Sequence, residues 1–112
     1  MILKYRLGYA IIIKNGVIEI MANVKAYALI SGSVQGIFFR SNTCYHAQEL
    51  GVNGWVRNRW DGKVEAIFEG EEGSVKELIG WCHKGPPGAV VRDVKVEWHQ
   101  YLDEFDSFSV RY

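Results

Sequence analysis

The sequence is poor in cysteine and proline. Of its 112 residues, two are cysteine and two are proline. Cys44 and Cys82 lie far apart, and neither belongs to a CxxC or Cys/His spacing, which excludes the usual patterns of a zinc site. We therefore expect no metal ion. Both cysteines lie on apolar faces of predicted helices, where free, buried thiols are expected.

An excess of either charge and long apolar runs are also missing. Thirteen Lys and Arg residues balance thirteen Asp and Glu residues, so a general binder of nucleic acids or anionic membranes is not expected. No run approaches the roughly 20 apolar residues that cross a bilayer, and the N-terminus lacks the pattern of a secretory signal. These absences favour a cytoplasmic protein whose partner is a small molecule.

The first twenty residues differ from the rest of the chain. Two β-prone runs, 5–13 and 17–20, flank Asn15-Gly16, a strong signal for a two-residue hairpin. Met21 follows and could be the start of a shorter protein. We divide the chain into an N-terminal extension, residues 1–20, and a domain, residues 21–112. We expect a monomer unless the extension mediates association, through a sheet edge or by exchange between two molecules.

The domain alternates strand and helix patterns. Strand patterns cover residues 24–30, 52–58, 63–69, 94–98 and 108–112. Helix patterns cover residues 41–50 and the segment after Gly70, where Val75, Leu78, Ile79 and Cys82 form an apolar stripe. The order β-α-β-β-α-β, with one extra short strand, predicts an α+β fold. It is a ferredoxin-like split β-α-β sandwich, an antiparallel sheet with two helices on one face.

Two further expectations concern burial. In the run 63–69, apolar residues alternate with Lys63, Glu65 and Glu69, so these three side chains are expected to face water. Most of the conspicuous aromatic residues are expected to pack in or against the core, and Trp60, in a predicted turn, is expected to be exposed. The aromatic residues considered are Phe38, Phe39, Trp55, Trp60, Trp81 and Trp98.

The segment between the first domain strand and the first helix carries the main functional signal. Gly32 and Gly36 allow the backbone to curl, and a helix N-terminus follows, so several N–H groups can point at one anion. Arg40 adds a planar charged fork that matches phosphate oxygens. Taken alone, this pattern also fits a purely structural turn. The predicted phosphate cradle consists of Ser33, Val34, Gln35, Gly36, Ile37, Phe38 and Phe39.

Three stretches together resemble the acylphosphatase family. They read Gly32-x-Val34-Gln35-Gly36-Ile37-Phe38-Phe39-Arg40, Gly54-Trp55-Val56-Arg57-Asn58 and Asp61-Gly62-x-Val64-Glu65-Ala66. The likeness spans essentially residues 24–112 and continues through Glu69-Gly70 and Gly85-Pro86-Pro87. Phe38 stands where many members carry glycine, and we expect it to narrow the mouth of the pocket.

The resemblance implies a ferredoxin-like fold, no cofactor, and hydrolysis of acyl phosphates to a carboxylate and inorganic phosphate. It also implies that Arg40 binds the phosphate and that Asn58 orients the attacking water. By itself Asn58 would equally suit a turn before the predicted hairpin.

Other functions fit the sequence less well. A cysteine nucleophile would precede a phosphate loop that closes on arginine, whereas Cys44 follows Arg40. A binding module of the same fold for RNA or protein would predict affinity without turnover, but the aromatic RNA motifs are missing. An acylphosphatase-like domain for carbamoyl phosphate opens larger hydrogenase-maturation proteins, and this chain ends too soon for that architecture.

Overall fold

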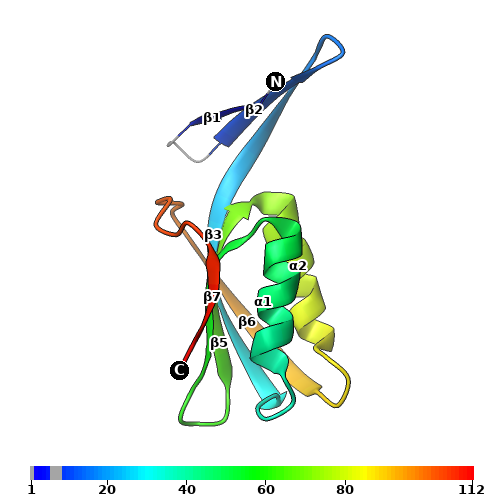
Figure 1. The fold of residues 1–112 in the computed structure, drawn as a ribbon, viewed down its shortest axis with the longest axis vertical. Helices are drawn as coiled ribbons and strands as arrows, with labels where there is room; N and C mark the ends of the chain where they lie inside the picture. The colour runs from blue at the N-terminus through cyan, green and yellow to red at the C-terminus, as the bar shows by residue number, and fades with distance from the viewer. Residues whose placement is uncertain (1, 6–8) are drawn as a thin grey trace.

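A computed structural model describes residues 2–5 and 9–112 as one mixed sheet with helices on one face (Figure 1). Its strands are β1 Ile2–Tyr5, β2 Tyr9–Lys14, β3 Val17–Ser33, β4 Asn53–Asn58, β5 Val64–Glu71, β6 Val90–His99 and β7 Phe108–Arg111. Its helices are α1 Phe39–Leu50 and α2 Glu72–Lys84. Residues 6–8, within the predicted run 5–13, lie outside the described residues.

The domain has the strand order β6-β3-β5-β4-β7. Every neighbouring pair in it is antiparallel except β4 and β7, which are parallel. Helix α1 packs on β4 and β7, and α2 packs on β3, β5 and β6, so both helices cover the same face. This arrangement confirms the predicted α+β, ferredoxin-like sandwich with two helices on one face. The sheet was predicted to be antiparallel but is mixed, because β7 runs parallel to β4.

Both helices are bounded by local signals. Helix α1 ends at Gly51, whose φ of 69° is the left-handed conformation that glycine tolerates best. Helix α2 begins after Glu71, whose side chain accepts hydrogen bonds from the backbone N–H groups of Gly73 and Ser74 at 2.8 and 2.9 Å. Among the described residues, no helix is both long and apolar enough to cross a bilayer.

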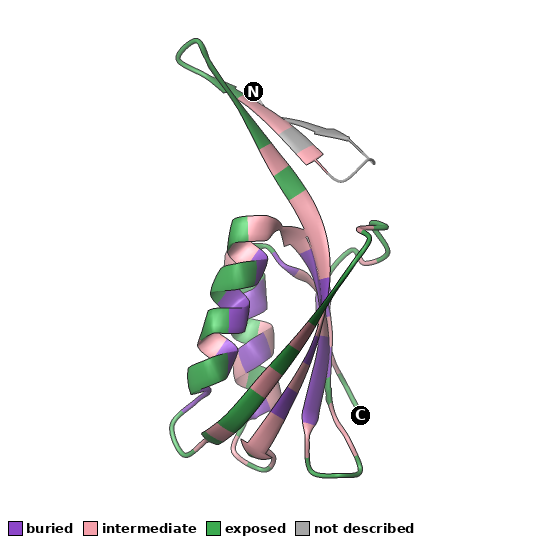
Figure 2. Cartoon of the chain, turned by 180° about the vertical axis from the view of Figure 1, so that it is seen from behind, coloured by how far each residue is buried: buried purple, intermediate pink, exposed green. Residues whose placement is uncertain are grey.

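The core lies between the helices and the sheet. The predicted stripe of α2 is buried, with Leu78 and Cys82 fully inaccessible, and it faces Ala26, Ala28 and other small or branched residues of the central strands. In Figure 2 the buried residues, in purple, lie on the helices and on the middle strands of the sheet. The apolar periodicity thus correctly predicted both helices and the buried stripe of α2. The buried residues of α1 are Phe39, Thr43 and Ala47.

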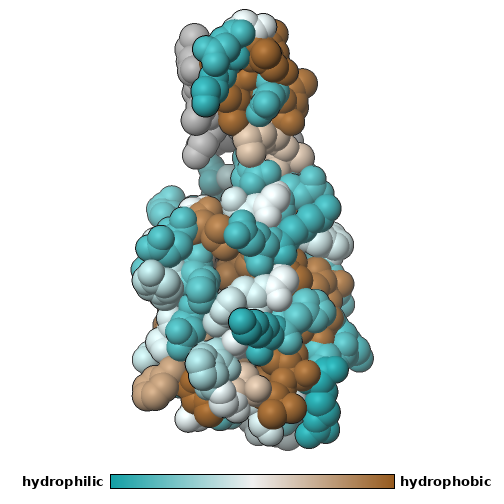
Figure 3. Space-filling model, turned by 90° about the vertical axis from the view of Figure 1, so that its right-hand side faces the viewer, coloured by the Kyte–Doolittle hydropathy of each residue, from teal (hydrophilic) through white to brown (hydrophobic). Residues whose placement is uncertain are grey.

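Strand β3 connects the N-terminal hairpin to the domain. Its first residues pair with β2 around the turn at Asn15-Gly16, as predicted, and its later residues pair with β5 and β6. The hairpin projects from one end of the domain (Figure 1). Figure 3 shows hydrophobic surface on this hairpin, at the top of the view. Its exposed apolar side chains include Ile13, Val17, Ile18 and Ile20.

Two glutamates of β5, Glu65 and Glu69, contradict the predicted alternation. Glu69 is 2% exposed, although it was expected to face water. Its carboxylate accepts hydrogen bonds from the backbone N–H groups of Leu102, at 3.3 Å, and Glu104, at 2.9 Å. The loop between β6 and β7 therefore covers this part of the sheet. Its backbone N–H groups donate the hydrogen bonds that water was expected to donate to Glu69.

Candidate active site

The loop between β3 and α1 has two residues with positive φ just before the helix begins. Gly36 has a φ of 78°, and Phe38, directly before the helix, has a φ of 62° in the left-handed region. The first intrahelical hydrogen bond runs from the backbone N–H of Asn42 to the Phe38 carbonyl oxygen, at 3.0 Å. The N–H groups of the first helical turn precede this bond and have no intrahelical acceptor. No acidic residue occupies this turn, so the positive end of the helix dipole is free to face an anion.

Gly32 has a different role from the one predicted. It lies inside β3, at a register shift in the pairing with β6, and does not curl the loop. A Cβ atom at this position would lie 2.0 Å from the carbonyl oxygen of Val90. Glycine is needed here because the two strands approach closely, just before the chain enters the loop.

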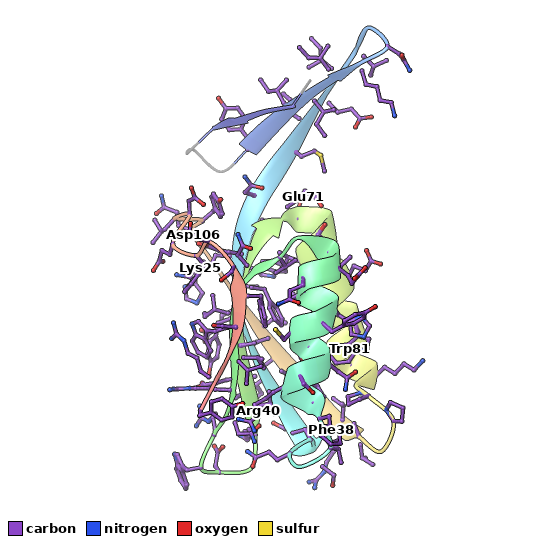
Figure 4. All side chains as sticks on the ribbon, in the orientation of Figure 1. Lys25, Phe38, Arg40, Glu71, Trp81 and Asp106 are labelled. Carbon is purple, nitrogen blue, oxygen red and sulfur yellow. The ribbon has the colours of Figure 1, made fainter. Side chains whose placement is uncertain are left out.

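Arg40 lies in the first turn of α1 and turns toward the C-terminus (Figure 4). Its guanidinium carbon is 4.8 Å from the ring centroid of Tyr112, and Nη1 is 3.4 Å from the carbonyl oxygen of Arg111. Within the described part of the chain, no carboxylate lies within ion-pair distance of Arg40. Its charge is therefore available to a ligand, while the Tyr112 ring and the Arg111 carbonyl fix its direction.

Asn58 is the last residue of β4, opposite the start of α1. It pairs with Val64 of β5, and the parallel register of β4 with β7 places Arg57 beside Arg111. The end of β4 and the C-terminus therefore lie next to each other. Across residues 2–5 and 9–112, the side chain of Asn58 has no hydrogen-bond partner, so its carboxamide can bind water or substrate.

These elements surround one cavity of about 300 Å³. Six predicted site residues line it: Val34, Gly36, Phe38, Phe39, Arg40 and Asn58. Ser33, Gln35 and Ile37 do not. Ser41, Val110 and Tyr112 also line it and were not predicted. The alternating pattern of residues 108–112 predicted a strand, but it could not show that this strand lies beside β4 and brings Val110 and Tyr112 to the cavity.

Gln35 points away from the cavity and joins the loop to the β4–β5 hairpin. Its Nε2 donates hydrogen bonds to the carbonyl oxygens of Arg59 and Lys63, each at 2.8 Å. These carbonyls belong to opposite sides of the hairpin turn, directly after Asn58 and directly before β5. The Gln35 side chain thus connects the segment that carries Arg40 to the segment that carries Asn58.

Glu65, also expected to face water, is 4% exposed. Its carboxylate accepts hydrogen bonds from the Tyr27 hydroxyl and from Nε of Arg57, and Arg59 lies 3.5 Å away. Burial acts to raise the pKa of Glu65, but these donors outweigh it and hold that pKa below its ordinary value. The expectation was wrong because the partners come from neighbouring strands, which alternation along one strand does not reveal.

The other conspicuous residues lie outside the cavity, with one exception. Phe39 and Trp81 pack at 5.5 Å between ring centroids, and Trp55 lies beside the guanidinium groups of Arg57 and Arg111. Trp60 is 95% exposed, as expected, in a separate depression with Asn58. Phe38 is 80% exposed and lines the cavity, where the predicted cradle placed it. Trp98 is 50% exposed, although most of these aromatic residues were expected to pack.

Neither cysteine lines the cavity. Both are free thiols, and burial raises the pKa of Cys82 to about 12. Cys44 is part-buried, and desolvation also raises its pKa. His46 packs against Trp81 in a tilted arrangement, at 4.4 Å between ring centroids. Among the residues that the structure describes, no three His, Cys, Asp or Glu side chains gather as a metal site.

Comparison with known proteins identifies the family. The acylphosphatase family model matches residues 26–110. The acylphosphatase of Pelotomaculum thermopropionicum is 48% identical over 92 residues, which are 82% of this chain and 100% of that protein. The acylphosphatase of Rubrobacter xylanophilus is 52% identical over 98 residues, 88% of this chain and 89% of the relative. The solved structure of an acylphosphatase from Coxiella burnetii matches with a TM-score of 0.76 at 37% identity, covering 80% of this chain and 93% of that one. This chain therefore belongs to the acylphosphatase family, enzymes that hydrolyse acyl phosphates.

Proposed function

We propose that Arg40 and the N–H groups at the start of α1 bind the phosphate of an acyl phosphate, while Asn58 positions the attacking water. The observation that carries this assignment is the shared cavity. Among the described residues, Arg40 has no carboxylate partner and the Asn58 carboxamide has no hydrogen-bond partner, and both face the same space from different layers. A phosphate there would meet a helix N-terminus and a guanidinium fork together.

The reaction needs little more than these groups. The carboxylate released from the carboxyl-phosphate anhydride is a stable leaving group, so no strong general acid is required. Water forms a new P–O bond, and the P–O bond to the acyl group breaks with its electron pair leaving on the carboxylate. The substrate phosphate accepts the water proton. Arg40 and the amides stabilise charge on the phosphate oxygens, and Asn58 aligns the water.

The substrate is a small acyl phosphate, and one chain supplies the whole site. Every described residue that lines the cavity comes from residues 34–112. We therefore extend the proposal to a monomeric active unit formed by the predicted domain of residues 21–112, without residues 1–20. Cytoplasmic location stays a prediction from the sequence.

Phosphate release from benzoyl phosphate tests the assignment, with a chelator present throughout. We expect Arg40→Ala and Asn58→Ala to lower kcat/KM by at least about a hundredfold, the usual scale for losing one preorganised transition-state contact. The matched controls are Arg92→Ala and Asn23→Ala, which alter residues of the same types outside the cavity. Full turnover in a folded Arg40→Ala or Asn58→Ala variant would remove that residue from the mechanism.

A further inference from the structure

Phe38 combines two features that are unfavourable for folding. Its backbone has φ 62° and ψ 26°, a left-handed conformation that glycine adopts easily and a bulky aromatic residue rarely does. Its side chain is 80% exposed. A strained backbone at a site wall, carrying an apolar ring into solvent, suggests that the ring serves binding.

The fold uses the backbone of Phe38 but not its ring. The Phe38 carbonyl oxygen accepts hydrogen bonds from the backbone N–H of Asn42, from Ser41 Oγ at 3.1 Å and from Asn42 Nδ2 at 2.9 Å. Glycine at position 38 could accept all three bonds. The neighbouring Phe39, which is 2% exposed, supplies the aromatic packing against Trp81.

The position of Phe38 in the cavity indicates what its ring would contact. Phe38 belongs to the loop before α1, whereas Asn58 belongs to the sheet layer beside the C-terminus. Phosphoryl transfer places the attacking and leaving oxygens roughly in line through phosphorus. If Asn58 holds the water on the sheet side, the acyl group leaves on the side of the loop, where the Phe38 ring stands.

We propose that the Phe38 ring is the contact surface for the acyl group, so that the enzyme favours acyl phosphates with a flat, apolar acyl part over those with a small one. This inference rests on the proposed function. An aromatic acyl group stacks on the ring and covers apolar surface that is otherwise exposed to water. An acetyl group is too small to cover it.

Trp60 offers the competing location. It is 95% exposed, but the depression that it lines contains Arg57, Arg59 and Glu65 and does not include Arg40. Asn58 borders both spaces, so an acyl group over Trp60 would lie on the side from which the water attacks. In-line geometry therefore favours Phe38.

The test compares kcat/KM for benzoyl phosphate with kcat/KM for acetyl phosphate in four variants. Phe38→Gly removes the ring and keeps the backbone N–H, and Phe38→Tyr keeps a ring. Tyr45→Ala removes an exposed aromatic side chain of α1 outside the cavity, and Trp60→Ala tests the competing location. Melting temperatures accompany the rates, and Phe38→Gly is expected to melt higher because the backbone strain is relieved.

We expect the benzoyl-to-acetyl ratio to fall about two- to tenfold in Phe38→Gly, the scale of one aromatic contact. The ratio should persist in Phe38→Tyr, Tyr45→Ala and Trp60→Ala. An unchanged ratio in Phe38→Gly, or a fall with Trp60→Ala instead, would overturn this proposal while leaving the proposed function intact. No phosphate release from either substrate by the unaltered chain would overturn both.

Discussion

Removing the amide of Gln35 should separate the two halves of the active site. Gln35→Met keeps the length of the side chain and removes both hydrogen bonds to the β4–β5 hairpin. Each such bond contributes a net of about 0.5–1.5 kcal/mol. The Lys63 carbonyl still accepts the Arg59 N–H at 2.8 Å, and the Arg59 carbonyl still accepts the Gly62 N–H at 3.3 Å. Because both carbonyl oxygens keep a backbone donor, the variant adds little free-energy penalty for unpaired carbonyl groups.

The expected destabilisation is about 1–3 kcal/mol. For a chain of 112 residues, 1 kcal/mol corresponds to about 4 °C in Tm, so Gln35→Met should melt roughly 4–12 °C lower. We also expect kcat/KM to fall about tenfold or more at a temperature where the variant is folded. The loop with Arg40 is then no longer held to the strand with Asn58, and small misplacements are costly in catalysis.

Gln35→Glu sharpens the experiment. It replaces the donor with a carboxylate that faces two carbonyl oxygens, so it should be less stable than Gln35→Met at neutral pH. Protonation of the new carboxyl restores one donor, so the difference should narrow in acid. Gln100→Met is the control, because Gln100 is exposed and lies outside the cavity. Unaltered Tm and kcat/KM in Gln35→Met, or equal stability of the two Gln35 variants at neutral pH, would refute this account.

Two further predictions follow from the same contacts. The pKa of Glu65 in the folded protein is below its ordinary value of 4.5, so the ionised carboxylate adds stability above that pH, and this stability is lost as the pH falls through the lower folded pKa. The urea midpoints of the unaltered chain and of Glu65→Gln should therefore converge in acid. A constant difference between the two midpoints would contradict the charge-based explanation. A chain that starts at Met21 should keep its kcat/KM for benzoyl phosphate within about twofold, since no described residue before Val34 lines the cavity. A larger fall would place residues 1–20 in the function.

The helices and hairpins were predictable because their signals are local. An apolar residue every three or four positions requires one buried helix face, and α2 buries the stripe from Val75 to Cys82. Asp61-Gly62 closes the β4–β5 turn for a similar reason, since Gly62, with a φ of 87°, takes a conformation that few other residues tolerate. Neither feature depends on a distant segment of the chain.

The burial of Glu65 and Glu69 was not predictable because it depends on distant segments. Alternation along β5 shows only that two faces exist, and it assumes that the polar face meets water. Tyr27 and Arg57 satisfy Glu65 from adjacent strands, and backbone N–H groups of the loop before β7 satisfy Glu69. Such partners make burial of a carboxylate tolerable. The left-handed backbone of Phe38 was not predictable either, since residue type does not reveal it.

The candidate site shows the same division between local and distant information. The motifs indicated that Arg40 and Asn58 belong to one site, but not what holds them in place. The fold provides two connections, one through the Gln35 side chain to the β4–β5 turn and one through β7, which runs parallel to β4 and brings Tyr112 under Arg40. Both connections join the helix layer to the sheet layer across the cavity. Because a phosphate would be bound from the first layer and attacked from the second, the rate should depend on the rigidity of these connections as well as on the two residues themselves.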